Sequence, residues 1–170
     1  MRRYVGELEQ TVDQDPLMPI YNRRAFMREL SRAQSVLDRY DIPSSVVYMD
    51  LDSFKAVNDE YGHCVGDDML KTVGAAIQAE IRECDMVARL GGDEFGVLLF
   101  KTHPKIAEAK AAALAKRIAA LEISTETGVI PTNVSWGVAT CNMRDSAEHV
   151  LAKADRKMYK AKRGARGSEA

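Results

Sequence analysis

The sequence has little of several features that mark particular classes of protein. Its 170 residues carry a formal net charge of −1, whereas proteins that bind nucleic acid or anionic membranes present an excess of basic residues. We therefore expect no nucleic-acid partner. No apolar run is long enough to cross a bilayer, and no secretory signal is visible at the start, so we expect no membrane segment in this chain.

Cysteine and histidine are also scarce. The three cysteines, Cys64, Cys84 and Cys141, are odd in number and widely separated. This spacing favours neither a disulfide framework nor a Cys-x-x-Cys metal site, and it fits the reducing environment of the cytoplasm. The three histidines are scattered as well, without the spacing of a zinc site.

The composition is that of one globular domain. Hydrophobic residues make up 46% and charged residues 29% of the chain, and this length is normal for a single core. Residues 1–14 carry apolar residues at helical spacing, and we expect a linker or signalling helix from an upstream region. Pro16 disfavours helical geometry at Asp15, so this helix is expected to end near Gln14 and a single domain to cover 15–170.

Hydrophobic periodicity and turn residues predict an alternation of helices and strands. We expect helices at 22–40, 54–61, from about 67 to 81, 105–121 and from 146 onward, and strands at 45–51, 86–90, 95–100 and, as a pair turning near 127–128, within 122–140. Asn22 and Ser146 are the expected caps of the first and last helix, and Asp52 or Ser53 of the short one, which Gly62 is expected to end. This order predicts one sheet packed against helices.

The stretch Arg89-Leu90-Gly91-Gly92-Asp93-Glu94-Phe95 lies between two runs of strand-forming residues. We expect a β-hairpin here, with both glycines at positive φ, a conformation that glycine adopts without a steric penalty. The turn would present Asp93 and Glu94 side by side, where repulsion and burial raise the pKa of both carboxyls. A bound Mg²⁺ would relieve this, because it prefers hard oxygen ligands. The alternative is a solvated acidic turn.

Asp50 lies near the end of the apolar strand expected at 45–51. If that strand is next to the hairpin, the ~4.8 Å spacing of neighbouring strands brings Asp50 close to Asp93. Several carboxylates around one point suit a pair of metal ions, which lie ~3.5–4 Å apart in phosphoryl-transfer enzymes. A strand-end cap or an ordinary salt bridge is the alternative for Asp50.

The stretch 91–95, with Arg89 before it, resembles the signature of GGDEF domains, the diguanylate cyclases. Further matches extend from about Asp15 to Arg166. The resemblance implies an α/β (α+β) fold: a central five-stranded, mostly antiparallel sheet flanked by helices, with a catalytic β-hairpin, similar to the cores of polymerase palms and adenylyl cyclases. It also implies that 15–170 is the catalytic domain.

The same resemblance implies metal ligands and catalytic groups. The residues expected to hold two Mg²⁺ ions, with Mn²⁺ as the alternative ion, are Asp50, Leu51 through its carbonyl, Asp93 and Glu94. Asp93 is the expected base for the ribose 3′-hydroxyl, and Glu94 completes the acidic cluster. Lys55 is expected on the phosphates of GTP, and a merely exposed lysine is the alternative.

The segment 58–67 resembles the guanine-reading part of the family. There Asn58 and Asp67 offer an amide and a carboxylate to the guanine edge, although Asp67 could also cap a helix. His63 is expected to pack and hydrogen-bond rather than to catalyse, and Leu17 and Phe54 to flank the purine. The residues expected at GTP are Phe54, Lys55, Asn58, His63, Asp67, Lys162 and Arg166.

The final helix is rich in lysine and arginine, which usually indicates a solvated face that suits the helix dipole. Its last part resembles the closing motif of the family, on which Lys162 and Arg166 reach the triphosphate. The chain departs from the family in two places. Ala165 stands where the family has glycine, and Met18-Pro19 replaces threonine and glycine, which is expected to stiffen that loop.

Arg82 and Asp85 have the Arg-x-x-Asp spacing of the site through which the family binds its product as an inhibitor. Arginine forks onto a phosphate or a guanine edge, and aspartate accepts from guanine. Basic residues of a neighbouring domain, such as Lys116 or Arg117, are expected to complete the contact. The alternative is a helix-terminal arginine followed by a turn aspartate.

Together these expectations predict a cytoplasmic diguanylate cyclase, within a longer sensor protein, that condenses two GTP molecules into cyclic di-GMP and two pyrophosphates. Because one domain holds one GTP, the active state is expected to be a homodimer, and cyclic di-GMP is expected to inhibit it. Three alternatives stay open: a non-catalytic GGDEF domain that senses GTP or cyclic di-GMP, a different nucleotidyl chemistry on the same core, and a dimerisation or partner module with an acidic loop.

Overall fold

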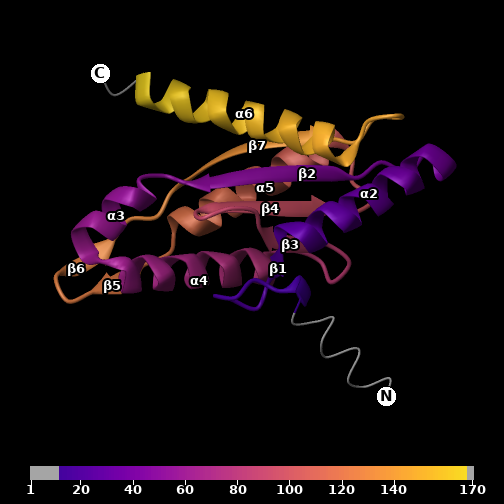
Figure 1. Cartoon of the computed structure of the whole chain (residues 1–170). Helices are drawn as coiled ribbons and strands as arrows, with labels where there is room; N and C mark the ends of the chain where they lie inside the picture. The colour runs from indigo at the N-terminus through magenta and orange to yellow at the C-terminus, as the bar shows by residue number, and fades with distance from the viewer. Residues whose placement is uncertain (1–11, 168–170) are drawn as a thin grey trace, which may run out of the picture.

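The computed structural model describes the backbone of residues 12–167 and the side chains of residues 12–164 (Figure 1). The helix expected within 1–14 therefore lies almost wholly outside the described residues. In chain order the elements are β1 (Tyr21–Asn22), α2 (Arg23–Tyr40), β2 (Ser45–Leu51), α3 (Phe54–Tyr61), α4 (His63–Glu80), β3 (Met86–Arg89), β4 (Glu94–Leu99), α5 (Pro104–Ala119), β5 (Ile123–Thr125), β6 (Gly128–Ile130), β7 (Val134–Thr140) and α6 (Ala147–Gly167). None of the helices in this part of the chain has a stretch long and apolar enough to cross a membrane.

Five strands form the central sheet, in the order β1-β3-β4-β2-β7. β1 runs parallel to β3, and the other neighbouring pairs are antiparallel. The predicted α+β fold with a five-stranded, mostly antiparallel sheet is therefore confirmed. β1 is not among the expected strands, because its two residues are too few to show an alternating pattern.

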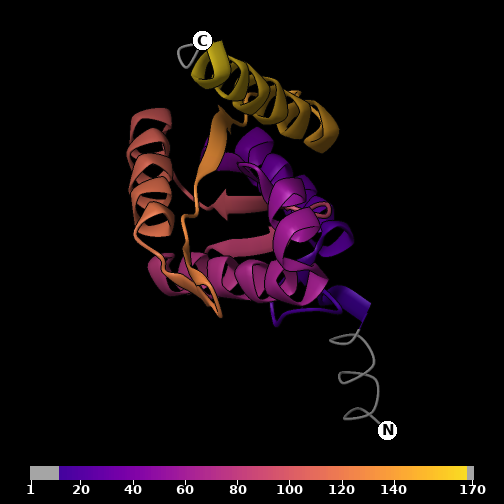
Figure 2. The same ribbon diagram turned by 90° about the vertical axis from the view of Figure 1, so that its left-hand side faces the viewer.

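Helices cover both faces of the sheet. Successive residues of β2 point to opposite faces, so Val46 and Tyr48 pack with α2 and α6, whereas Val47 and Met49 pack with α4 and α5. Figure 2 shows α4 and α5 on one side of the strands and α2 and α6 on the other. Burial on both faces explains why β2 is a nearly unbroken apolar run up to Asp50.

The expected caps are present at the first and last of these helices. The Oδ1 atom of Asn22 accepts a hydrogen bond from the backbone nitrogen of Ala25 at 3.0 Å, and the Oγ atom of Ser146 accepts one from that of His149 at 3.1 Å. Both predictions are confirmed. The short helix α3 also has the predicted bounds, but Ser53 before it has a φ of 59° and makes no capping hydrogen bond.

The prediction that the next helix begins near Asp67 is wrong. α4 begins at His63, directly after α3, because Gly62 redirects the chain with a φ of 85°, a conformation that glycine adopts without a steric penalty. Asp67 is consequently inside α4 and is not its N-cap. The shift places residues 63–66 on a helix rather than in a loop.

The strand pair expected within 122–140 is three strands instead. β5 and β6 form a separate two-stranded sheet around the predicted turn at Thr127-Gly128, and β7 joins the central sheet beside β2. Pro131 lies between β6 and β7, and because proline has no N–H to donate, it interrupts the ladder there. The position of the turn was predicted correctly, but the pairing of Val134–Thr140 was not.

α6 packs on β7 at very short range. A Cβ atom on Gly137 would lie 2.3 Å from both the carbonyl oxygen of Ala154 and the backbone nitrogen of Met158. Only a residue without a side chain lets the helix backbone approach the strand this closely. This contact fixes the position of α6 along the sheet.

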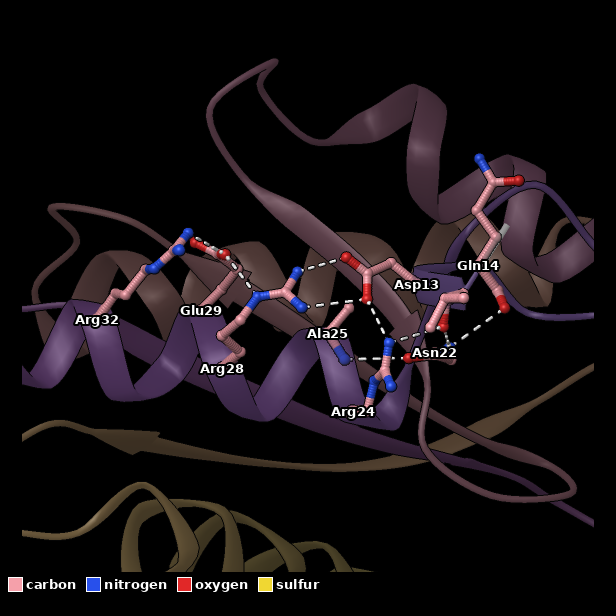
Figure 3. A network of polar contacts seen from close by, with 9 residues as sticks. Asp13, Gln14, Asn22, Arg24, Ala25, Arg28, Glu29 and Arg32 are labelled. Carbon is pink, nitrogen blue, oxygen red and sulfur yellow. Dashed lines mark hydrogen bonds and ion pairs between the residues drawn. The ribbon is translucent and has the colours of Figure 1, made fainter. Parts of the chain in front are cut away.

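The N-terminal segment 12–15 is tied to the start of α2 by polar contacts (Figure 3). The carboxylate of Asp13 forms ion pairs with Arg24 at 3.2 Å and with Arg28 at 2.6 Å, and the side-chain amide of Asn22 donates to the carbonyl oxygen of Val12 at 2.8 Å. The hydrogen bond from Arg28 is the largest cause that lowers the pKa of Asp13 to about 2. The segment is thus held beside β1, at the edge of the sheet.

Candidate active site

The residues expected at the active site meet where β2 ends and the β3–β4 hairpin turns. β3 and β4 pair as predicted, and the backbone nitrogen of Leu90 donates to the carbonyl oxygen of Glu94 at 2.8 Å. The expectation that Gly91 and Gly92 have positive φ is wrong, because neither is among the described glycines in that conformation. The hairpin is confirmed, but its turn has a different backbone conformation.

Gly91 leaves room for the carboxylate of Glu94, which a side chain at this position would displace. A Cβ atom there would lie 2.1 Å from the Oε2 atom of Glu94. The guanidinium group of Arg89 holds the turn, with Nε donating to the carbonyl oxygen of Gly91 at 3.1 Å and Nη2 to that of Gly92 at 2.8 Å. Arg89 also forms an ion pair with Asp15 at 3.5 Å. Side-chain contacts therefore stabilise this turn, without a left-handed residue.

Asp50 and the hairpin are direct neighbours, as predicted. Asp50 is the register partner of Glu94 across β2 and β4, and the backbone nitrogen of Leu51 donates to the carbonyl oxygen of Asp93 at 3.0 Å. Three carboxylates from two strands and one turn are thus brought to the same end of the sheet.

Burial and repulsion raise the pKa of two of these carboxyls. For Asp50 the largest cause is burial, Asp93 adds to the rise, and a hydrogen bond from Lys162 opposes it. For Glu94 burial is again the largest cause, a hydrogen bond from Tyr48 opposes the rise, and the charges of Asp50 and Asp93 add to it. A further positive charge at this point would lower the pKa of both carboxyls.

Lys162 brings one positive charge to the cluster from α6. Its Nζ atom contacts the Oδ1 atom of Asp50, and the two side chains are only 19% and 14% exposed. Arg166, the other residue expected at the triphosphate, is also on α6, but its side chain and that of Ala165 are outside the described residues. The structure therefore adds to the sequence prediction a direct contact between Lys162 and an expected metal ligand.

The donor chemistry of the cluster suits a divalent cation. Asp50 and Glu94 offer the hard oxygen ligands that Mg²⁺ prefers, and the causes that raise the pKa of each carboxyl also favour a cation between them. Within residues 12–167, no three aspartate, glutamate, histidine or cysteine side chains are arranged so as to hold a metal ion. The carboxylates are therefore of the type that binds Mg²⁺, but the described side chains do not form a three-ligand metal site.

Tyr48 belongs to this site and was not predicted. It lies two residues before Asp50 on β2, and its side chain is buried. Burial and the negative charge of Glu94 raise the pKa of its hydroxyl. Side chains alternate along a strand, so Tyr48 and Asp50 are on the same face of β2. This alternation is the sequence pattern from which Tyr48 could have been predicted.

The residues expected at the guanine base lie on α3 and α4, which pack together. The Oδ1 atom of Asn58 is buried without a hydrogen-bond partner, and a Cβ atom on Gly66 would lie 1.9 Å from it. A buried carbonyl oxygen without a donor costs free energy unless a ligand supplies one. Phe54 and Asp67 are half-buried on the same two helices. The Oδ1 atom of Asn58 therefore lacks a donor, and in this conformation it lies against Gly66 rather than open to a ligand.

The other residues expected at GTP differ in exposure. Lys55 is exposed near the start of α3, and Leu17 is half-buried against the core. His63 is exposed, so the expectation that it packs is wrong, because the early start of α4 puts it at a helix terminus. Met18, which replaces threonine, is buried, and Asp15 holds its loop by accepting from the backbone nitrogen of Leu17 at 2.9 Å.

Arg82 and Asp85 form a bidentate ion pair in the segment between α4 and β3. The Nε and Nη2 atoms of Arg82 donate to the carboxylate of Asp85 at 2.9 and 2.8 Å. The Asp85 side chain is 1% exposed and also accepts from the backbone nitrogen of Phe100 at 3.1 Å, whereas the Arg82 side chain is 55% exposed. A ligand can reach Arg82 directly but not Asp85. Lys116 and Arg117 are exposed near the end of α5.

The chain matches the family model described as Diguanylate cyclase, GGDEF domain, over residues 12–168. It is 36% identical over 169 residues to the diguanylate cyclase TpbB of Pseudomonas aeruginosa, an alignment that covers 96% of this chain and 38% of TpbB. It is also 36% identical over 169 residues to the cyclic di-GMP phosphodiesterase PdeR of Escherichia coli, which covers 98% of this chain and 25% of PdeR. The chain thus spans well under half the length of these relatives.

Among solved structures, the fold is similar to the crystal structure of the diguanylate cyclase SiaD from Pseudomonas aeruginosa in complex with its activator SiaC. The TM-score is 0.89 at 29% sequence identity, and the alignment covers 96% of this chain and 63% of SiaD. Because the family model matches nearly the whole chain and its signature residues form the hairpin beside Asp50, the chain belongs to the GGDEF family of diguanylate cyclase domains.

Proposed function

We propose that the chain is the catalytic domain of a diguanylate cyclase, which condenses two molecules of GTP into one cyclic di-GMP and two pyrophosphates. The observation that carries this proposal is the pairing of Asp50 with Glu94 across β2 and β4, beside Asp93. Burial raises the pKa of the Asp50 and Glu94 carboxyls, so this end of the sheet favours a cation and the phosphates that accompany it.

The acidic cluster has two tasks in this proposal. The proposed ligands of Mg²⁺, or of Mn²⁺ in its place, are Asp50, Asp93, Glu94 and the carbonyl of Leu51. When bound, the ion supplies Lewis-acid stabilisation of the reacting phosphate. Asp93 takes the proton of the ribose 3′-hydroxyl, and the 3′-oxygen attacks the α-phosphate of the other nucleotide, from which pyrophosphate leaves.

Basic side chains hold the phosphates. Lys55 is exposed beside the first N–H groups of α3, and a lysine with free helix N–H groups attracts phosphate. Lys162 lies on Asp50, so it is within reach of an anion that shares the cluster, and Arg166 follows it one turn later on α6. These three residues neutralise charge that develops during transfer.

The guanine base is recognised between α3 and α4. The Oδ1 atom of Asn58 is buried and has no partner in the described structure. When GTP binds, the amide turns from Gly66 so that this atom accepts from the N–H groups of the guanine edge, and Asp67 accepts beside it. Leu17 and Phe54 flank the ring, and His63 borders the site from solvent. An adenine base offers a different edge, so this arrangement favours GTP.

The reaction requires two copies of the domain, because each copy supplies one GTP and one 3′-hydroxyl. We propose a homodimer as the active state in the cytoplasm, with residues 1–14 as the link to an upstream region that controls the encounter. Cyclic di-GMP inhibits by binding Arg82, whose side chain is 55% exposed, and the buried Asp85 positions its guanidinium group.

The test is incubation of the purified protein with GTP and Mg²⁺, followed by separation of the products by mass. We expect cyclic di-GMP and pyrophosphate, and a specific activity that rises with protein concentration. Asp93→Ala and Glu94→Gln should abolish the product while keeping the thermal melt close to that of the wild type, because both residues lie outside the core. Full turnover by either variant would refute the assignment of the site.

A binding function is the second candidate, and the contact between Lys162 and Asp50 favours it, because it already places a positive charge at an expected metal ligand. Such a domain would bind GTP or cyclic di-GMP without turnover. Calorimetry that shows binding of GTP, together with no product at any protein concentration, would select this candidate.

A further inference from the structure

A hollow of about 420 Å³ lies between α5 and α6, beside β7 at the edge of the central sheet. Figure 2 shows β7 running between these two helices. We call this hollow the α5–α6 groove. Its floor includes Val138 and Ala139, each only 4% exposed. A volume of this size is within the range of small-molecule sites.

Four basic side chains of α6 line the α5–α6 groove: Lys153, Arg156, Lys157 and Lys160. Their spacing of three and four residues puts them on one face of the helix, along a length of ~10 Å. Lys162 is half a turn away around the helix, on the face that meets the acidic cluster. The groove is therefore separate from the proposed GTP site.

These positive charges are poorly compensated. Lys153 pairs with Asp145 at 2.8 Å, but no carboxylate in the described part of the chain lies within ion-pair distance of Arg156, Lys157 or Lys160. Like charges that converge on one hollow repel one another. An anion with several charges would relieve this repulsion and accept hydrogen bonds from these side chains.

The shape of the groove restricts the kind of anion. An acidic peptide that adds a strand to β7 needs exposed backbone groups on that edge, and the burial of Val138 and Ala139 leaves few of them. Among the described residues that line the groove, Glu108 of α5 alone is acidic, so a compact polyanion meets almost only positive charge. A short row of cations beside a strand edge that is almost fully covered fits a small anion.

We propose that the α5–α6 groove binds an oligophosphate, either a free phosphate chain or the phosphate tail of a nucleotide. Arg156, Lys157 and Lys160 contact the phosphates, and Val138 and Ala139 lie beneath them. The proposal does not depend on the diguanylate cyclase reaction, because none of these residues belongs to the proposed catalytic machinery.

The test is calorimetric titration of the whole chain in EDTA with inorganic tripolyphosphate and, separately, with ATP. The variant Lys157→Gln with Lys160→Gln removes two charges from the groove, and the control Arg39→Gln with Lys71→Gln removes two from exposed positions on α2 and α4. We expect the wild type and the control to bind each probe at the groove, with an affinity that falls roughly tenfold or more in the groove variant, since charge-assisted hydrogen bonds are lost. Any binding at Lys55 and Lys162 should be the same in the groove variant and the control.

The two probes distinguish the sources of the phosphate. Tighter binding of ATP would indicate a nucleotide whose base or ribose adds contacts in the groove, and equal binding would indicate a phosphate chain alone. Equal affinity in the groove variant and the control, no binding of either probe, or tighter binding of a polyglutamate peptide than of tripolyphosphate would each overturn the proposal. Thermal melts of both variants establish that they are folded.

Discussion

The ammonium group of Lys162 lies on the carboxylate of Asp50, although the two residues are 112 positions apart in the sequence. The contact joins α6 to the end of β2, where the β3–β4 hairpin turns. Both side chains are mostly buried, so each charge depends on the other for part of its compensation.

The first prediction is that Lys162→Met lowers the free energy of unfolding by about 1–3 kcal/mol at pH 7 without added metal. This is less than for a fully buried pair, because both side chains keep some exposure. The hydrogen bond from Lys162 opposes the rise in the pKa of Asp50, so in the variant that pKa is higher still. The deficit should therefore shrink as the pH falls and Asp50 takes up a proton.

Denaturant unfolding at several pH values measures this effect. The double variant Asp50→Asn with Lys162→Met is the control, because it removes both charges and should recover most of the loss. A single variant as stable as the wild type at pH 7 would show that the contact contributes nothing to folding.

The second prediction concerns the space around Asn58. In Gly66→Ala the new Cβ would lie 1.9 Å from the Oδ1 atom of Asn58, so the amide must move away. We expect GTP affinity to fall by a factor of about 5 to 150, because an unpaired guanine donor costs ~1–3 kcal/mol. Asn58→Ala, which creates no clash, should have a similar effect.

The comparison that isolates the base is calorimetry with GTP and with ATP. Both variants should reduce the preference for GTP over ATP. Gly164→Ala is the matched control, because no atom lies within 4 Å of a Cβ at that position. An unchanged preference in Asn58→Ala would mean that this amide does not read guanine.

The third prediction is that Arg82→Ala has two separable effects. Asp85 is 1% exposed, and it would lose its guanidinium partner, so we expect the free energy of unfolding to fall by about 1–2 kcal/mol. Binding of cyclic di-GMP should also fall, because Arg82 is the exposed member of the pair.

Calorimetry with cyclic di-GMP and denaturant unfolding measure the two effects independently. Arg82→Lys keeps the charge but not the bidentate geometry, so it should recover more stability than binding. If Arg82→Ala binds cyclic di-GMP as tightly as the wild type does, the pair has a structural role only.

The fourth prediction is a pH dependence at the N-terminal segment. The pKa of Asp13 is lowered to about 2 from 3.8 by Arg28 and Arg24, so the stabilisation that it provides is complete above the unfolded value. It is lost as the pH falls through about 2. In Arg28→Gln the midpoint should move up toward the ordinary value.

Carboxyl chemical shifts of Asp13, followed by nuclear magnetic resonance as a function of pH, give this midpoint directly. Arg32→Gln is the control, because Arg32 pairs with Glu29 rather than with Asp13. A midpoint that is the same in the wild type and in Arg28→Gln would contradict the network drawn in Figure 3.

Elements with strong local signals could be predicted from the sequence. β2 is a long apolar run and α2 begins at an asparagine cap, and both were located correctly. β1 could not be found, because it exists only through pairing of Tyr21 and Asn22 with β3. The pairing of β7 was predicted wrongly. The sequence shows a hairpin turn at Gly128, but it does not show that the chain leaves this hairpin at Pro131 and that β7 pairs with β2 instead.

At the candidate site, too, some features could be predicted from the sequence and others could not. The neighbourhood of Asp50 and the hairpin followed from the spacing of strands, and it was found. The contact of Lys162 with Asp50 depends on how α6 crosses the sheet, which no local pattern encodes. From the sequence, the glycines of the turn were attributed to a positive φ, whereas in the structure Gly91 leaves room for the carboxylate of Glu94.

Gly137 of β7 lies so close to the backbone of α6 that the orientation of this helix depends on position 137. Met158, which meets it, precedes Lys162 by one helical turn. A side chain at position 137 would push α6 away from β7. The helix would tilt, and the ammonium group of Lys162 would be displaced from Asp50. The compensation of the negative charges at Asp50 and Glu94 therefore depends in part on Gly137, which has no side chain and lies in β7, outside the site.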